Sequence, residues 1–101
     1  MNYKRKFGDL IKDLRIENEL PLRKVAAILD IDTSTLSKIE KGERNASKEI
    51  VKTLSIFFKK DHEEMLITYL SDKVASELME ESCSSKVLKV AAEKIKYIRS
   101  K

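Results

Sequence analysis

Apolar residues recur three or four positions apart along most of this chain, a spacing that places side chains on one face of an α-helix. The β-branched residues are scattered instead of alternating with polar ones, so no strand is predicted and the chain is expected to be all-α. Pro21 suits a first helical turn, where its missing N–H would have no partner. The predicted helices cover, approximately, residues 4–18, 22–29, 33–41, 48–58 and 62–70, and two further helices are predicted near 74–81 and 87–98.

The apolar side of each predicted helix supplies a candidate core. Its members before the fourth helix are Phe7, Leu10, Ile11, Leu14, Ile16, Val25, Ala26, Ile28, Leu29, Ile31, Leu36 and Ile39. The fourth and fifth helices add Ile50, Val51, Leu54, Phe57, Phe58, Met65, Leu66, Tyr69 and Leu70. Apolar residues make up 42% of the 101 residues, which is enough for one modest domain, or a small domain with an appendage.

Residues that begin and end helices stand between these apolar segments. Asp32 and Ser47 can each accept hydrogen bonds from the free N–H groups of a following first turn. Asp61 and Glu64 have the spacing of a capping box. Gly42 adopts the left-handed conformation at little cost, so it is expected to end the third helix.

The third predicted helix, residues 33–41, has two different faces. Leu36 and Ile39 are three residues apart and lie on one side. The opposite side carries only small polar or cationic residues: Thr33, Ser34, Ser37 and Lys38. A slim polar face that ends in cations fits the major groove of DNA.

Charge is unevenly distributed along the chain. Residues 1–60 hold 14 Lys and Arg against 9 Asp and Glu, a net charge of +5, whereas residues 61–101 hold 7 against 8, a net charge of −1. The basic excess therefore lies in the same half as the two-faced helix, which favours a polyanionic partner. Charge alone is equally consistent with a solvated, Lys-rich surface.

The sequence contains no constellation typical of an enzyme or a metal site. Cys83 is the single cysteine, which excludes an internal disulfide and suits a reducing cytoplasm. No base accompanies Cys83 or its neighbouring serines, and His62 has no second ligand at metal-binding spacing. No apolar run approaches the ~18 residues of a membrane span. We expect a cytoplasmic protein that is not an enzyme and that uses no cofactor or metal.

Residues 7–70 resemble the Cro/C1-type helix-turn-helix family of phage repressors and Xre-like regulators. The resemblance covers about two-thirds of the chain and combines apolar spacing, turn length and the closing Ile-Glu-Lys-Gly sequence. The matching positions are Leu14-Arg15, Leu20, Val25-Ala26, Leu29, Ile31, Ser34-Thr35-Leu36-Ser37-Lys38-Ile39-Glu40-Lys41-Gly42, Ser47 and Leu54.

The resemblance implies a five-helix, phage-repressor-like DNA-binding domain over residues 1–70, whose third helix lies in the major groove of double-stranded DNA. A C-terminal helical extension follows over residues 71–101. Arg15 and Glu40 match a salt bridge inside the family's domain. Carried over by position, the base-facing residues are Thr33, Ser34, Ser37 and Lys38, those near the DNA backbone are Thr35 and Lys41, and the phosphate-facing loop residues are Arg44 and Asn45.

Three positions depart from the family pattern. Leu22 stands where the family often has a phosphate-contacting Gln, so Arg23 or Lys24 is expected to replace that contact from the next positions. Asp30 stands in a turn where Gly is common, and Asp tolerates the left-handed conformation. Ala46 stands where the family often has Pro.

The two ends of the chain allow two interpretations each. The segment Lys4-Arg5-Lys6 suits either an arm on DNA or a frayed, solvated end, and the second is preferred. In the extension, Ser82–Ser85 forms a break with serines able to cap a last helix. That last helix has more apolar residues than one packed face needs. We therefore expect residues 71–101 to mediate a homodimer, the alternative being a tail that folds back on a monomer.

These observations predict a sequence-specific DNA-binding transcriptional regulator, a repressor by promoter occlusion. An alternative is an antitoxin or other partner-binding helix-turn-helix protein whose last helices bind a different protein. A third possibility is a protein-interaction module that no longer binds DNA. Fold alone does not decide between these functions. The Thr, Ser and Lys residues of 33–41 argue against the third possibility, because they are residues that suit contact with DNA.

Overall fold

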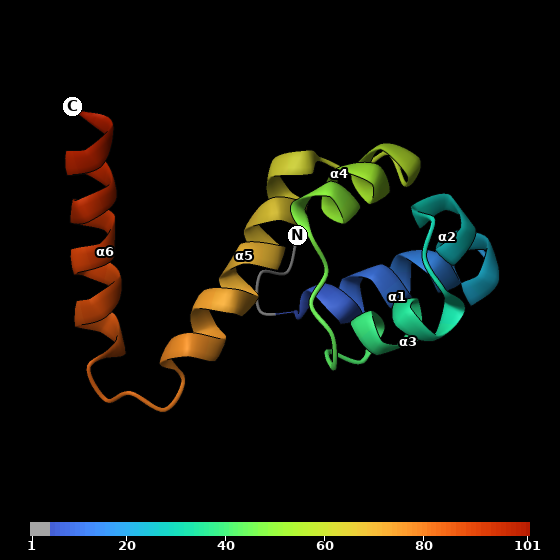
Figure 1. Ribbon diagram of the computed structural model, residues 1–101, viewed down its shortest axis with the longest axis horizontal. Coiled ribbons are helices and arrows are strands. Elements are labelled where there is room, and N and C mark those ends of the chain that lie inside the picture. The colour runs from blue at the N-terminus through green and yellow to red at the C-terminus, as the bar shows by residue number, and fades with distance from the viewer. Residues whose placement is uncertain (1–4) are drawn as a thin grey trace.

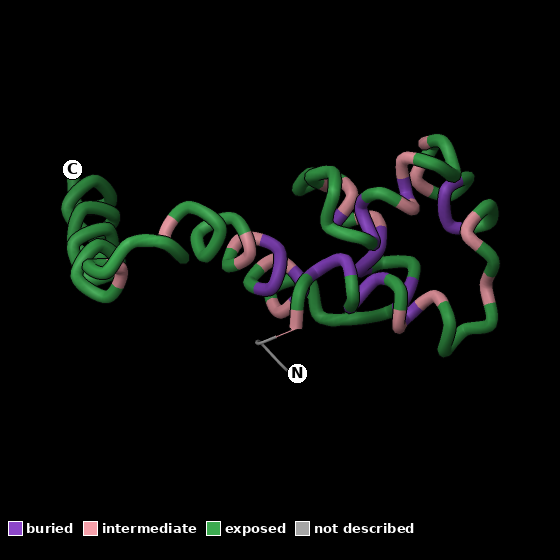
Figure 2. Tube along the Cα trace, turned by 90° about the horizontal axis from the view of Figure 1, so that it is seen from below, coloured by how far each residue is buried: buried purple, intermediate pink, exposed green. Residues whose placement is uncertain are grey.

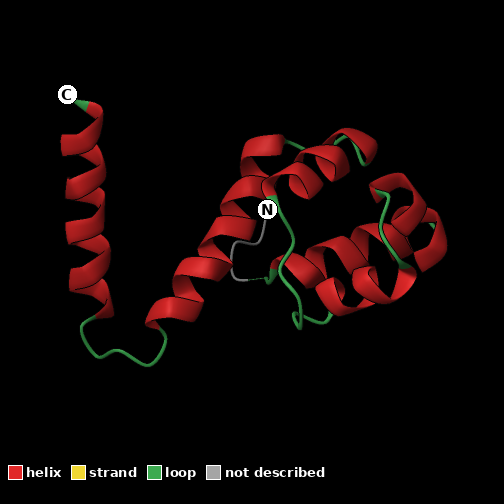
Figure 3. Ribbon diagram, in the orientation of Figure 1, coloured by secondary structure: helices red, strands yellow, loops and turns green. Residues whose placement is uncertain are grey.

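The computed structural model describes residues 5–101, and these residues form six α-helices and no strand (Figures 1 and 3). The helices are α1 Phe7–Glu17, α2 Leu22–Leu29, α3 Thr33–Glu40, α4 Lys48–Phe57, α5 His62–Leu78 and α6 Ser84–Arg99. The all-helical fold predicted from the sequence is confirmed. Within the described residues, none of the helices combines the length and apolarity that crossing a lipid bilayer requires.

Helices α1 to α5 form one packed body, and α6 stands apart from it (Figure 1). α1 packs against both α3 and α5, while α2 packs against α3 and α4, and α4 packs against α5. None of these helix pairs includes α6. Figure 2 shows the same division, because the buried segments all lie in the body and α6 contains no buried residue.

The core consists of apolar side chains from all five helices of the body. Its buried members are Phe7, Leu10, Ile11, Leu14, Val25, Ala26, Leu36, Ile39, Val51, Leu54, Phe58, Met65 and Tyr69. Partly buried residues packed around them include Leu22, Leu29, Ile31, Ile50, Leu66 and Leu70. This set matches most of the core predicted from spacing.

Three predicted core residues are exposed instead: Ile16, Ile28 and Phe57. Ile16 follows buried Leu14 by two positions, which turns it about 200° around the helix, and it is 55% exposed. α4 ends at Phe57, and Phe58 turns inward instead, with the two rings in edge contact at 4.9 Å. Apolar residues at the margins of a stripe therefore pack only where a neighbouring element covers them.

The predicted helix caps are partly confirmed. Ser47 Oγ accepts a hydrogen bond from Ile50 N, and Asp61 Oδ2 accepts one from Glu64 N. Asp32 occupies the N-cap position of α3 with extended backbone, but its exposed carboxylate makes no capping hydrogen bond. The predicted serine cap of the last helix was also wrong, since Cys83 occupies that N-cap position and makes no side-chain capping bond.

The start of α1 differs from the prediction, because the helix begins at Phe7 instead of residue 4. Lys4 lies outside the described residues, and Arg5 forms an ion pair with Asp13 at 2.8 Å, so Arg5 is not a solvated end. The Phe7 N–H donates to Asp72 Oδ2 at 2.8 Å, and the Phe7 ring meets Tyr69 edge-on. A carboxylate of α5 therefore caps α1 across the fold.

Helix α5 runs without a break through residues 70 and 71, the point where the sequence divides the family-like domain from the extension. Its first half is packed on α1 and α4, and Asp72 is the last residue with a hydrogen bond to the body. The turns that join α5 to α6 follow after Leu78.

Candidate nucleic-acid interface

Helix α3 buries one face and exposes the other. Leu36, Ile39 and Glu40 are buried where α3 packs against α1 and α2. On the opposite side, Thr33, Ser34 and Lys38 are exposed and Ser37 is half-buried. Figure 1 shows α3 at the margin of the body, on the side away from α4 and α5. The helix thus offers solvent the polar face that the spacing predicted.

The end of α3 is fixed by Gly42. Its φ is +77°, which is the left-handed conformation that glycine adopts without strain. Gly42 N donates to Ile39 O at 3.1 Å, and Glu43 N donates to Lys38 O at 2.9 Å. These two bonds form a Schellman motif, which satisfies carbonyls at the helix end and turns the chain sharply. The prediction that Gly42 ends this helix is confirmed.

The ion pair between Arg15 and Glu40 anchors α3 to α1. Arg15 Nε and Nη2 donate to the two Glu40 oxygens at 2.8 and 3.0 Å, and Arg15 Nη1 donates to Leu20 O at 3.1 Å. The two side chains are only 13% and 5% exposed. Hydrogen bonding to Glu40 raises the pKa of Arg15 above its ordinary value. The internal salt bridge expected from the resemblance is confirmed, and both charges are paired inside the fold.

The loop between α3 and α4 carries exposed Arg44 and Asn45. Ala46, next in the chain, accepts a hydrogen bond from the Tyr69 hydroxyl at 3.1 Å. Tyr69 is buried on α5, so the loop is held against the body from the inside. The sequence predicted Tyr69 as a core residue but gave no sign of this loop contact.

The first turn of α2 exposes two further cations, Arg23 and Lys24. Leu22 packs against the core, which explains the apolar residue where the family often has Gln. Asp30 ends α2 with φ +56° and ψ +45°, and Ile31 N donates to Ala26 O at 3.0 Å. The left-handed turn predicted at Asp30 is confirmed.

A family model described as Helix-turn-helix matches residues 11–65. The matched segment runs from the first half of α1 into α5 and contains α2, α3 and α4 entirely. This chain belongs to the Cro/C1-type helix-turn-helix family. Comparison with curated proteins and comparison with solved structures each found no match.

Membership in the Cro/C1-type family identifies the chain as a DNA-binding helix-turn-helix regulator. In this fold the second and third helices, here α2 and α3, form the helix-turn-helix. The matched segment leaves out α6 and most of α5. The family match therefore says nothing about the role of α6 or of the second half of α5.

The exposed cations of the helix-turn-helix are unpaired among the described residues. Ion pairs within residues 5–101 join Arg5 to Asp13 and Arg15 to Glu40, and neither involves the exposed cations. Those exposed cations are Arg23, Lys24, Lys38, Lys41 and Arg44. Thr35 is half-buried between the polar and the packed face of α3. Cations without an internal partner are free to neutralise phosphates.

Gly8, which was not singled out from the sequence, brings α1 close to the end of α3. A Cβ on Gly8 would lie 2.5 Å from Glu40 O and 2.6 Å from Ile39 O, both backbone atoms at the end of α3. Only a residue without a side chain fits this crossing. A glycine inside an otherwise good helical pattern was the available signal, because glycine there usually has a packing reason.

Proposed function

We propose that this chain is a sequence-specific transcriptional repressor that binds double-stranded DNA as a homodimer in the cytoplasm. The observation that carries the proposal is the outward face of α3, which is polar, exposed and free of internal ion pairs. A helix of this kind enters the major groove while the rest of the domain rests on the phosphate backbone.

Thr33, Ser34, Ser37 and Lys38 are proposed to face the base edges. Lys38 can donate to guanine O6 and N7, which makes it the best candidate for a specific contact. Hydroxyl groups both donate and accept, so the Thr and Ser side chains discriminate bases weakly, although their carbon atoms can touch a thymine methyl group. Part of the selectivity is therefore expected to come from DNA shape.

The backbone contacts are proposed to come from three places. Arg23 and Lys24 approach a phosphate from the first turn of α2, whose N–H groups also favour an anion. Thr35 on α3 and Lys41, the residue that follows this helix, are proposed to approach the DNA backbone. Arg44 and Asn45 reach a phosphate from the loop that Tyr69 holds. These contacts give affinity and register, and they carry no base preference.

A homodimer would present two recognition helices to successive major grooves, about 34–36 Å apart, so the operator should be a near-palindrome. We propose that residues 71–101 mediate this dimer, and that bound protein represses by covering a promoter. Helix α6 supports the proposal, because its apolar residues are exposed in the single chain. The same exposure supports a second candidate, in which these residues bind a different protein, as an antitoxin binds its toxin.

Selection of bound duplexes from a randomised pool, at about 150 mM salt to suppress nonspecific binding, tests the proposal. An enriched palindrome is expected, and its half-site spacing gives the dimer geometry. Binding without any enriched sequence would overturn the sequence-specific function. An enriched single half-site would retain sequence reading and overturn the dimer.

Lys38→Ala should weaken binding to the selected site by about 1–3 kcal/mol and relax the preference at one base position. Lys12, exposed on α1, provides a matched control because Lys12→Ala removes the same charge away from the recognition face. Titration of both variants against the best site and its single-base substitutions measures the effect. Equal affinity of Lys38→Ala and the unaltered protein would refute the base contact.

Arg44→Ala should weaken binding to all duplexes alike and reduce the slope of log K against log salt by about one, because one phosphate contact is lost. Titrations of the selected site and of a random duplex at several salt concentrations measure both quantities. A loss confined to the selected site would instead make Arg44 a base-reading residue.

A further inference from the structure

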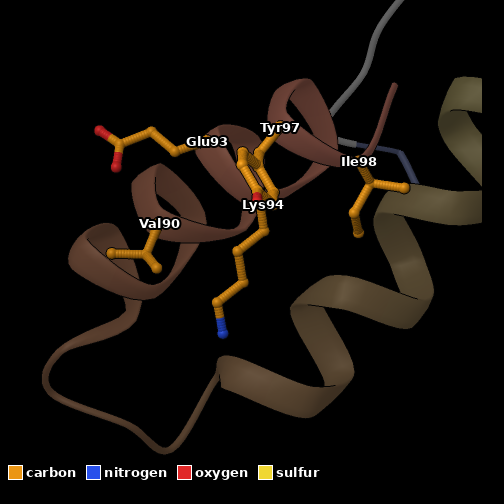
Figure 4. Close-up of a pocket in the computed structure, with 5 residues that line it drawn as sticks. All are labelled: Val90, Glu93, Lys94, Tyr97 and Ile98. Carbon is orange, nitrogen blue, oxygen red and sulfur yellow. The ribbon is translucent and has the colours of Figure 1, made fainter. Parts of the chain in front are cut away.

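Helix α6 has an apolar stripe with nothing packed on it. Leu88 and Ile95 are 48% and 51% exposed, and no residue of α6 is buried. Figure 4 shows a shallow depression at its C-terminal half, lined only by residues of α6 itself: Val90, Glu93, Lys94, Tyr97 and Ile98. The α6 stripe consists of Val87, Leu88, Ala91, Ile95 and Ile98. The spacing of three, four and three residues between Leu88, Ala91, Ile95 and Ile98 is that of the apolar a and d positions in a coiled coil.

Helix α5 has a second apolar stripe on the side away from the core. We call this the α5 outer stripe: Ile67, Val74 and Leu78 supply its apolar side chains, with Ser71 between them, at spacings of four, three and four residues. Ile67 and Val74 are each 43% exposed. The buried residues of α5 lie on another side of the helix, where Met65 and Tyr69 meet the body. Residues 5–101 therefore leave both stripes largely uncovered, although Leu78 at the end of the α5 outer stripe is half-buried.

The two stripes lie in segments of opposite charge. Residues 61–83, which contain α5, hold seven Asp and Glu against one Lys, a net charge of −6. Residues 84–101, which contain α6, hold six Lys and Arg against one Glu, a net charge of +5. Glu63 and Glu77 border the α5 outer stripe, and Lys94 and Arg99 flank the α6 stripe at the positions that pair charges in coiled coils.

The connection between the helices holds α6 away from its own α5. Met79 N donates to Ala75 O, Glu81 N to Leu78 O, and Ser84 N to Glu81 O, so the turn is built from backbone hydrogen bonds. Figure 1 shows the result: α6 rises beyond the end of α5 and does not lie along it. The complementary stripes of one chain do not meet, but two chains related by a twofold axis can join them twice.

We propose that a second copy of this chain covers both stripes, with α6 of each copy packed on the α5 outer stripe of the other. The inference rests on the proposed homodimer and specifies how it is built. Apolar stripes of matching length supply the contact, and the opposite charges of the two segments favour α6 against α5 over α6 against α6, which would bring two cationic helices together. The exchange places the dimer contact on α5, the helix that also caps α1 and holds the loop between α3 and α4.

Complementation between two variants tests this arrangement. Val74→Asp breaks the α5 outer stripe and Ile95→Asp breaks the α6 stripe, and both positions are exposed in the single chain, so the fold should be retained. Each variant alone should be monomeric by light scattering, with its dimer Kd raised about 30-fold or more. An equimolar mixture should form a mixed dimer, because the intact α6 of one variant meets the intact α5 of the other.

Three results would overturn the exchange. A dimer of Val74→Asp alone would mean that α6 pairs with α6. A mixture that stays monomeric would mean that the two stripes do not face each other. A monomeric unaltered protein would leave α6 to a different protein partner. Circular dichroism of each variant confirms folding, and half-site DNA binding by the monomeric variants reports separately on α3, so a failed exchange is distinguishable from a failed DNA-binding function.

A charge variant gives an independent test. Arg99→Glu should raise the dimer Kd by about tenfold, because it places an acid beside the acidic segment of the partner. Lys89→Glu makes the same change in net charge on the opposite side of α6 and should leave the dimer Kd unchanged. Equal effects of the two substitutions would show that only net charge matters and would contradict the proposed geometry.

Discussion

Helices α4 and α6 have the same spacing of apolar residues, yet only α4 is packed in the body. Both are amphipathic, with apolar residues three and four apart. Val51 and Leu54 of α4 are completely buried, whereas the corresponding residues of α6 all stay in solvent. The difference is that α5 and α2 pack against α4, while no helix of the body packs against α6. An apolar stripe predicts a helix that needs a partner, and it does not say which partner.

The largest difference is expected between truncation of a leucine in α4 and truncation of a leucine in α6. Leu54→Ala should lower the free energy of unfolding by about 2–5 kcal/mol, because it removes buried methyl groups and leaves a cavity. Leu88→Ala should change the stability of the monomer by less than about 0.5 kcal/mol, since that side chain is exposed. Urea unfolding at low protein concentration measures both. A comparable loss for Leu88→Ala would mean that α6 packs on its own body.

A smaller effect is expected from adding one methyl group to the body. Gly8→Ala should cost about 1–3 kcal/mol of stability, because the new Cβ would collide with the backbone carbonyls of Ile39 and Glu40. Gly42→Ala is the control, since nothing lies within 4 Å of its added Cβ and only the positive φ opposes it, at about 1 kcal/mol. Thermal unfolding compares the two. A neutral Gly8→Ala would show that α1 and α3 have room to separate.

The smallest effect is expected on α5, the helix that packs in the body and leads to α6. Tyr69→Phe removes the hydroxyl that donates to Ala46 O and should cost about 1 kcal/mol of stability. It should also weaken DNA binding a few-fold at all sequences, because the loop bearing Arg44 is held less firmly. Titration against selected and random duplexes checks this, with Tyr97→Phe on exposed α6 as the matched control. A loss of stability with unchanged DNA affinity would mean that the loop keeps its position without the hydroxyl.

Much of the body was predictable from sequence because its signals are local. Gly42 ends α3, Ser47 caps α4 and Asp30 takes the left-handed conformation, and each depends on residues within one turn. The Arg15–Glu40 pair spans 25 positions, so local spacing could not predict it, and it was expected only from the resemblance to the family. The polar face of α3 followed from residue spacing, whereas its contacts with DNA stay a prediction.

Other features depend on contacts between residues far apart in the chain. The Asp72 carboxylate caps α1 from 65 positions away, and Tyr69 reaches Ala46 across 23 positions. The exposure of Ile16 and Phe57 was missed for the same reason, since helical spacing does not tell which margin of a stripe a neighbour will cover.

The sequence by itself determined the all-helical class, the helix ends set by local caps, the helix-turn-helix family and the two-faced character of α3. Only the tertiary structure decided that α1 and α3 touch through Gly8, that α5 holds the loop between α3 and α4, and that α6 is left unburied by residues 5–101. The reason is physical. Propensity, capping and periodicity act within a few residues, whereas close packing is set by the shapes of surfaces brought together from distant parts of the chain.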